Sequence, residues 1–237
     1  ANQFKFMEWT LFGIPTLDPL PPSTHIPSLG AAYRGYVTGT KTSFIPKTMI
    51  PEAIMNPPVS WYGHISAGLP REDQFDGPYT FPPEGGSRVH MIWSDSPCWE
   101  TCWNGGFKMQ DALRDESIEC VVVQHPWMEN DTMFADIILP SNTKFETEDI
   151  GTDCDSGQWN VVFYERQAIK PLGESKSDKE VVAEVAKKLE KFGGIYEDIY
   201  DKYLGGKTDD EWIRVGFDTS GAPEGMSFEE FSTKYLF

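Results

Sequence analysis

Two short apolar runs near the middle of the chain give the clearest pattern of hydrophobic and polar positions. Residues 119–124 and 135–139 have strand length and are rich in β-branched side chains, and a polar loop separates them. Such runs predict buried strands of a parallel sheet. Ligands of open α/β sheets lie at the carboxyl ends of parallel strands. The loop that leaves Val123 and carries Gln124, His125, Trp127 and Asp131 is therefore a candidate ligand-contact segment.

The pattern around these runs predicts a βαβ unit. Residues 88–93 form another strand-like run, and residues 107–114 have helical spacing. Strand, helix and strand in this order predict parallel strands with a right-handed crossover. The clearest helix spans 173–192, where Ser177 and Glu180 form a capping box before an apolar stripe. The predicted fold class is α/β, with a Rossmann-like parallel sheet and flanking helices.

Composition divides the chain into three expected parts. Residues 1–87 are rich in proline and glycine, which forbids long helices and central strands, yet they are also rich in aromatics. A disordered linker would lack those aromatics, so we expect a long, irregular but ordered excursion. Residues 88–192 form the α/β domain. Residues 193–237 are expected to be an acidic connecting segment with Trp212 and Phe217 as anchors.

The net charge of −17 argues against nucleic-acid binding, which needs a basic surface. Its simplest consequence is solubility, and a basic docking partner is the sharper alternative. No run approaches the ~18 apolar residues of a membrane span, so no direct membrane insertion is expected. The chain starts at Ala1 with what looks like folded interior at 4–12, so we expect part of a larger multidomain subunit. The expected location is the cytoplasm, with the periplasm as the alternative.

Metal-ligating residues do not form a recognisable site. Cys98 and Cys102 are four residues apart, but no second pair and no histidine completes a zinc pattern. Acidic residues crowd 146–155, but their spacing does not fit a calcium loop, and solvated loop acids are the preferred interpretation. We therefore expect no metal ligand and no complete iron–sulfur site in this chain.

Small and polar residues follow the strand at 88–93. Residues 94–106 are expected to form one loop, which begins with the small and polar residues 94–97. Gly105 and Gly106 precede the helix, where a helix N-terminus suits phosphate. Asp95 could accept hydrogen bonds from a ribose hydroxyl or a base N–H. Neither a GxGxxG nor a Walker pattern is present, so an ordinary loop is the alternative to a nucleotide contact.

Two further features of the loops have alternative interpretations. His125 could contact a ligand, but no carboxylate and nucleophile form a triad with it. Trp99, Trp103 and Trp127 could line an apolar pocket, or they could pack in the core.

Residues 89–189 resemble the molybdopterin oxidoreductases of the dimethyl sulfoxide reductase family. That family has a Gly-x-Asn-Pro loop after one strand, Gln-Asp-x-Phe-x-Thr-Glu-Thr-Ala after the next, and then Ala-Asp-Val-Val-Leu-Pro. The first loop keeps only its proline here, but the spacing between the second and third motifs is the same. The matching segments are 94–97, 124–132, 135–140, 146 and 171–178.

The resemblance implies a bis-molybdopterin guanine dinucleotide cofactor with molybdenum or tungsten, bound in part by residues 88–192. His125 stands where the family commonly has aspartate, so the contact chemistry must differ. The metal's protein ligand lies upstream in this family, and the chain offers no candidate for it. The implied cofactor contacts are Trp93, Ser94, Asp95, Ser96, Pro97, Gln124, His125, Trp127, Met128, Glu129, Asp131 and Thr132.

Residues 1–87 contain the segments Phe4-Lys5-Phe6, His25-Ile26-Pro27, Ile45-Pro46 and Ile50-Pro51-Glu52-Ala53-Ile54. In these segments they are most similar to the branch of this family that acts on phenols, the pyrogallol–phloroglucinol transhydroxylases and related anaerobic bacterial enzymes. This implies hydroxyl transfer, hydroxylation or dehydroxylation of a phenolic substrate, with Trp9, Trp61 and Tyr62 in the substrate funnel. Implied partners are the remainder of the large subunit and an iron–sulfur subunit with 4Fe-4S clusters. Two alternatives stay open: a family oxidoreductase for an oxyanion or sulfur compound, and a non-catalytic nucleotide-binding or interaction module.

Overall fold

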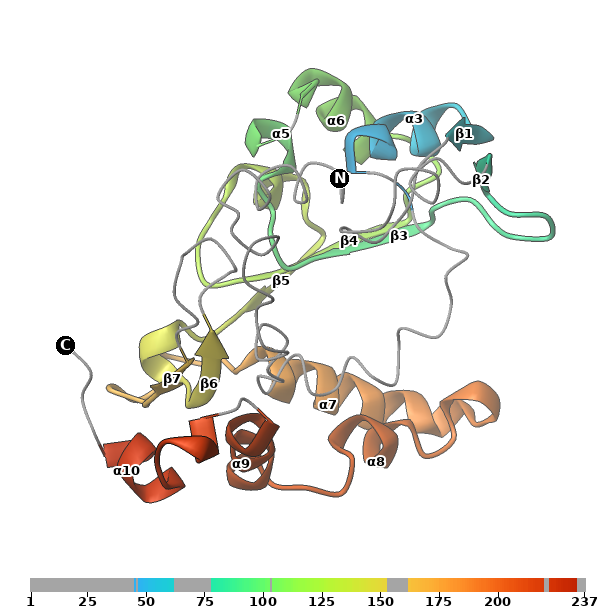
Figure 1. Cartoon of the computed structure of the whole chain (residues 1–237). Helices are drawn as coiled ribbons and strands as arrows, with labels where there is room; N and C mark the ends of the chain where they lie inside the picture. Colours follow the sequence, from blue (N-terminus) through green and yellow to red (C-terminus); the bar gives the residue numbers. More distant parts are fainter. Residues whose placement is uncertain are drawn as a thin grey trace. The chain divides into compact units, whose positions relative to one another are not determined.

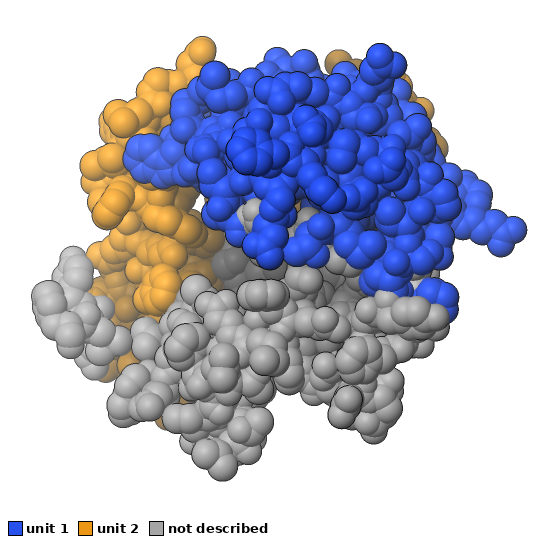
Figure 2. Space-filling view, turned by 90° about the horizontal axis from the view of Figure 1, so that it is seen from above, with its two compact units in different colours: residues 1–8, 40–141 blue, residues 9–39, 142–237 orange. Residues whose placement is uncertain are grey.

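The computed structural model describes residues 45, 47–61, 78–102, 104–152, 162–219 and 222–233, and it mixes helices with strands (Figure 1). The chain divides into two compact units, which are coloured separately in Figure 2. Described residues up to Ser141 belong to unit 1, and those from Asn142 onward belong to unit 2. The domain boundaries expected at residues 87 and 192 stay predictions.

Unit 1 contains a three-stranded sheet with helices on it, so the α/β class is confirmed in this coarse form. The strand order is β3-β4-β5, and both pairings are parallel. The three predicted strands thus exist, although each begins one to three residues later than predicted. The elements of unit 1 are η4 (Lys47–Met49), α3 (Ile50–Met55), β1 (Val59–Trp61), β2 (Tyr79–Phe81), β3 (Met91–Ser94), α5 (Trp99–Cys102), α6 (Gly106–Leu113), β4 (Cys120–His125), η5 (Asn130–Phe134) and β5 (Ile137–Pro140).

The central strand β4 explains why this sheet is stable. Its residues 121–124 are buried, as expected for a parallel strand with neighbours on both sides. Helices α6 and α3 lie on the same side of the sheet (Figure 1). One core cluster joins α3, α6, β3 and β4 through the side chains of Ile54, Ile92, Met109, Ala112, Leu113, Val121 and Val123.

Asp136, from the Ala-Asp motif before β5, fixes this strand to β4. Its carboxylate accepts a hydrogen bond from the Val121 N–H at 2.7 Å, and its own N–H donates to the Val121 carbonyl at 2.9 Å. The aspartate therefore starts the parallel pairing at the amino end of the strands, far from the expected ligand edge.

Unit 2 combines a two-stranded antiparallel sheet, β6-β7, with helices. Trp212 and Phe217 are buried as predicted, and they pack with Ile150, Ile213 and Phe231. In the described residues of the segment from 193 onward, expected to be a connection, the chain forms the α-helices α8, α9 and α10. The elements are η6 (Lys144–Glu146), β6 (Asp149–Thr152), β7 (Val162–Glu165), α7 (Asp178–Leu189), η7 (Glu190–Phe192), η8 (Gly194–Tyr196), α8 (Ile199–Leu204), α9 (Asp209–Thr219), η9 (Ala222–Glu224) and α10 (Phe228–Thr233).

The predicted capping box of α7 is confirmed. The Ser177 hydroxyl accepts from the Glu180 N–H at 3.2 Å, and the Glu180 carboxylate accepts from the Ser177 N–H at 2.8 Å. Helix α7 is shorter than predicted because it begins only after this box. A capping box of the same kind precedes α9, where it joins Thr208 and Glu211, and α10, where it joins Ser227 and Glu230.

We expect Ser177→Ala to lower the free energy of unfolding by about 1 kcal/mol, the usual value of an N-cap hydroxyl. Urea denaturation of the full chain measures this difference. Ser177→Asp is the matched control, because aspartate caps helices as well as serine does. A loss in Ser177→Asp equal to that in Ser177→Ala would show that capping is not the cause.

Candidate cofactor site

The carboxyl ends of the three parallel strands form one edge of the sheet. Ser94 ends β3, and His125 and Pro140, which are paired in register, end β4 and β5. Residues 95–98 and 126–129 therefore leave the sheet at the same edge. The structure thus brings together the two loops that the sequence predicted as ligand contacts.

Asp131 joins these two loops. Its carboxylate accepts hydrogen bonds from the N–H of Trp99 at 2.7 Å and of Glu100 at 3.1 Å, at the start of α5. Its own N–H donates to the Pro97 carbonyl at 2.9 Å. Helix α5 lies in what the sequence suggested was a continuous loop. This carboxylate explains why the helix begins at Trp99.

Asp131 is only 4% exposed, so its environment differs from that of a surface acid. Burial raises the pKa of its carboxyl group, and the nearby Glu100 and Glu129 carboxylates act in the same direction. The two N–H donors of α5 oppose the rise in pKa but do not cancel it. The geometry makes Asp131 a residue that holds the loops in place.

The twelve predicted contact residues separate into an outer and an inner set. The outer set is available to a ligand, and the inner set shapes the loops. Exposed residues are Trp93, Asp95, Ser96, Trp127 and Met128, half-buried ones are His125 and Glu129, and buried ones are Ser94, Pro97, Gln124, Asp131 and Thr132.

Three large apolar side chains of the outer set are exposed at this edge. Trp127 is 63% and Met128 is 69% exposed, and they are neighbours on the loop after β4. Trp93 is less exposed, and its indole N–H donates to the Gln124 side-chain oxygen at 3.1 Å. Exposed apolar groups that gather in one place often mark a surface that binds a partner or a ligand.

His125 orders the turn after β4. Its Nδ1 lies 3.1 Å from the Trp127 carbonyl oxygen and 3.3 Å from the Trp127 backbone nitrogen. The tautomer decides whether Nδ1 donates to the carbonyl or accepts from the N–H, and either bond fixes the loop. His125 thus positions the exposed Trp127 through backbone contacts.

The glycines at the start of α6 serve packing. Gly105 has a φ of 83°, which favours glycine. A Cβ on Gly106 would lie 2.0 Å from the Glu100 carbonyl oxygen, so only glycine lets α5 approach α6 this closely. The pattern that suggested a phosphate loop therefore has an observed structural role.

The other aromatic residues selected from the sequence are either packed in unit 1 or not described. Trp99 packs against the core of unit 1, as the alternative interpretation held. Trp61 is half-buried on β1. Trp9, Tyr62 and Trp103 lie outside the residues whose side chains the structure describes.

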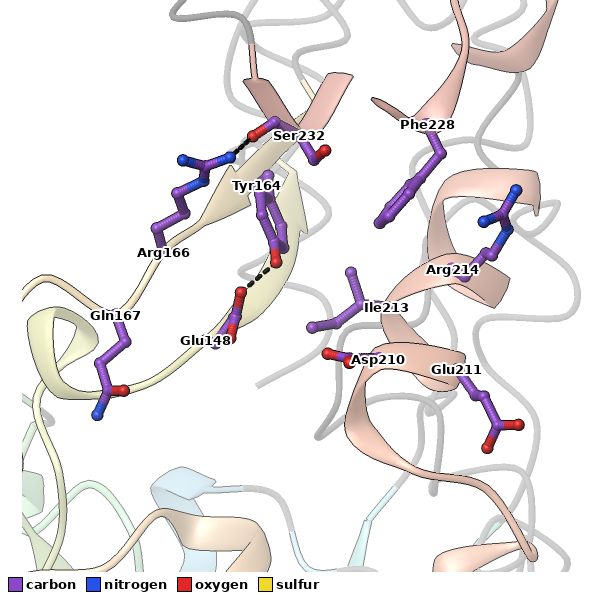
Figure 3. A pocket seen from close by; sticks show the side chains of 10 residues that line it. All are labelled: Glu148, Tyr164, Arg166, Gln167, Asp210, Glu211, Ile213, Arg214, Phe228 and Ser232. Atoms are coloured by element: carbon purple, nitrogen blue, oxygen red, sulfur yellow. Dashed lines mark hydrogen bonds between the residues drawn. The ribbon is translucent and has the colours of Figure 1, made fainter. Parts of the chain in front are cut away.

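A cavity of about 680 Å³ lies in unit 2, among residues that the sequence analysis did not select (Figure 3). Its polar groups contact one another: Tyr164 donates to Glu148, and Arg166 donates to the Ser232 carbonyl. Burial, followed by the Glu148 contact, raises the pKa of Tyr164 to about 12. Arg214 stacks on Phe228 with 5.2 Å to the ring centroid. These contacts stabilise unit 2 itself.

Within the described ranges, no group of three or more His, Cys, Asp or Glu side chains is placed to hold a metal ion. In the same ranges, no helix is both long and apolar enough to span a membrane. The glutamate that we interpreted as a solvated loop acid, Glu146, is in fact buried. That interpretation was wrong because backbone N–H groups surround its carboxylate.

Residues 103–188 match the family model for molybdopterin oxidoreductases, a range that includes β4, its loop and β5. This match confirms the resemblance that the sequence indicated. Over 247 aligned residues, it is 29% identical to the pyrogallol hydroxytransferase large subunit of Pelobacter acidigallici. Over 125 residues, it is 32% identical to the dimethyl sulfoxide reductase DmsA of Escherichia coli strain K12.

The two relatives are matched over different shares of the chain. The first alignment covers 100% of this chain and 26% of the hydroxytransferase subunit. The second covers 52% of this chain and 14% of DmsA. The chain therefore spans about a quarter of the length of the first relative.

Proposed function

We propose that this chain is part of the catalytic subunit of a molybdenum or tungsten enzyme and holds the guanosine end of a bis-molybdopterin guanine dinucleotide. The observation that supports this most is the joined pair of loops at the carboxyl edge of the sheet, held by Asp131. The second of these loops lies within the family match. Ligands of open α/β sheets bind at this edge.

The exposed residues of the site suit a nucleotide. Trp127, Trp93 and Met128 offer apolar surface and aromatic faces for a planar base, and such stacking is worth about 1–3 kcal/mol per base. Asp95 and Ser96 are exposed and supply a carboxylate and a hydroxyl for N–H and O–H groups. When bound, the metal centre would exchange oxygen or electrons with the substrate. The role of these residues is to hold and orient the nucleotide.

Trp127→Ala is expected to weaken retention of the guanine nucleotide about tenfold without lowering the thermal stability of the apoprotein, since the side chain is largely exposed. The measurements are the GMP content of the purified full-length subunit and its melting temperature. Met133→Ala is the control, because Met133 is exposed outside the predicted contact set. Equal GMP content in Trp127→Ala and wild type would contradict the assignment of this loop.

For the substrate, we propose a phenol undergoing hydroxyl transfer, hydroxylation or dehydroxylation. Support comes from the similarity to the pyrogallol hydroxytransferase large subunit, which extends over the whole chain, including residues 1–87. Trp9, Trp61 and Tyr62 are the proposed funnel contacts. A sulfur compound is the second candidate, since the DmsA match reaches a higher identity over half of the chain.

The proposed partners follow from the same comparison. Because the first relative is named a large subunit, we propose a smaller partner that contains 4Fe-4S clusters, in addition to the remainder of the large subunit. The acidic surface implied by the net charge of −17 would suit a basic face on that partner. An anaerobic bacterial source and a cytoplasmic location complete the proposal.

Metal and nucleotide analysis of the full-length subunit tests the proposed function. We expect molybdenum or tungsten in stoichiometric amount, with pterin and GMP released by acid. A folded full-length subunit without either would refute the proposal. Turnover of pyrogallol compared with dimethyl sulfoxide then separates the two substrate candidates.

A further inference from the structure

Two cysteines lie beside the candidate site and have no part in the proposed function. Cys98 directly precedes α5 and is half-buried, and Cys102 ends α5 and is exposed. The Cys102 N–H donates to the Cys98 carbonyl at 2.8 Å, which closes one helical turn. Residues four apart on a helix lie on the same face, so the two thiols are neighbours. Both are free.

The surroundings keep the Cys98 thiol protonated at neutral pH. Burial raises the pKa of Cys98 to about 11, and the Cys102 thiol and the Asp131 and Glu129 carboxylates add to this. Reactive cysteines are instead found in electropositive surroundings that stabilise the thiolate. A ligand of this pair must therefore react with the neutral Cys98 thiol and leave no extra negative charge behind.

The spacing of the two cysteines disfavours a direct disulfide. Cβ atoms of residues four apart on a helix are about 5–6 Å apart, whereas a disulfide needs about 3.5–4.5 Å. Closing that distance would tighten α5, which Asp131 holds through two N–H groups. An atom bonded to both sulfurs at about 2.3 Å keeps them further apart than an S–S bond of about 2.05 Å does.

The side chains around the two cysteines also limit which ligand the pair can bind. In the described part of the chain, no third His, Cys, Asp or Glu side chain completes a metal site with them. Zinc prefers four ligands, so this pair does not suit zinc. A centre that needs only two sulfurs from the protein, and is neutral when bound, matches the site.

We propose that Cys98 and Cys102 form a dithiol site for trivalent arsenic, in which one arsenic atom bridges the two sulfurs. With an organoarsenic oxide, two S–H bonds and the As–O bond break, two As–S bonds form, and the two protons leave with the oxygen as water. No electron transfer occurs, and the product is neutral. The bridged turn would fix α5, and with it the loop that Asp131 joins to the site.

Phenylarsine oxide and the full chain, reduced and kept under argon, test the proposal. We expect the intact mass to increase by a single phenylarsine, which a 1,2-dithiol removes and a monothiol does not. The adduct should be absent in Cys98→Ser and in Cys102→Ser, and should persist in Cys120→Ser and Cys154→Ser. Circular dichroism checks the fold of each variant. If Cys98→Ser does not fold, the result with Cys102→Ser alone tests the proposal, because Cys102 is exposed.

Two results would overturn the dithiol site. One is an adduct that persists in Cys102→Ser or that a monothiol removes, because either shows arsenic bound by a single sulfur or at another position. The other is rapid conversion of the reduced wild-type pair to a disulfide by peroxide, which would show that the turn tightens without resistance. Neither result bears on metal and GMP content, so the proposed function is tested separately.

Discussion

Replacing Asp131 by alanine is expected to separate the two loops of the candidate site and to lower the free energy of unfolding by about 2–4 kcal/mol. The carboxylate accepts from two N–H groups of α5, and hydrogen bonds to a charged group contribute about 1.5–3 kcal/mol each. Because Asp131 is 4% exposed, the variant also leaves these donors buried without a partner. Urea denaturation measures the free energy of unfolding. The GMP content of the full-length subunit measures how much nucleotide the candidate site retains.

Two further variants test whether this effect comes from the carboxylate itself. Glu129→Ala removes a carboxylate from the same loop that makes no side-chain hydrogen bond to another described residue, so a small loss is expected. Asp131→Asn keeps the shape, but its amide has only one acceptor oxygen, so the loss should lie between those of the other two variants. Equal stability of Asp131→Ala and Glu129→Ala would show that the loops are held in another way.

The sheet was predictable because its signal is local. Apolar β-branched runs of strand length were sufficient to predict β3, β4 and β5, and the helix between the first two implied parallel pairing. The position of the candidate site followed as a hypothesis, since parallel strands place their carboxyl ends at one edge. The capping box likewise predicted α7. Each of these inferences uses residues that are close in sequence.

The features that were missed depend on contacts between distant residues. Helix α5 begins where the carboxylate of Asp131, more than thirty positions away, accepts from its first N–H groups. The exposure of each predicted contact also depends on tertiary packing, which is why Thr132 and Asp131 are buried beside the exposed Trp127. Helix α9 could have been predicted, because Thr208 and Glu211 form the same box that marked α7.

The motif acids show how a family resemblance and a structure complement each other. Asp136 and Glu146 belong to the segments by which the chain resembles its family, and both bind backbone N–H groups of their own unit. A position in a family motif can thus contribute by fixing the backbone. The exposed Trp127 and Asp95 remain the side chains on which direct contact with the nucleotide is proposed.

Glu146→Gln is expected to lower the melting temperature of the full chain at neutral pH by several degrees. The Glu146 carboxylate is 4% exposed and accepts from the Thr143 N–H at 2.8 Å, the Thr143 hydroxyl at 2.8 Å and the Leu172 N–H at 2.7 Å. It therefore connects η6 to the segment that precedes α7. A glutamine offers one acceptor oxygen in place of two, so one of these connections is lost.

The Glu146 carboxylate also makes the stability of the folded state depend on pH in a definite direction. The Thr143 N–H and hydroxyl, followed by the Leu172 N–H, hold the pKa of Glu146 below its usual value of 4.5. A lowered pKa means that the folded state favours the ionised form, so this stabilisation is complete above the unfolded value. It is lost as the pH falls from roughly 5 through the lowered pKa.

Thermal unfolding of wild type and Glu146→Gln across that acidic range measures the effect. We expect the difference in melting temperature between the two proteins to shrink as the pH falls, because the wild-type carboxylate becomes protonated and loses its advantage over the amide. Glu174→Gln is the matched control, an exposed acid in the segment before α7 that should match wild type throughout. A difference between wild type and Glu146→Gln that stays constant with pH would show that the charge of Glu146 does not contribute to stability.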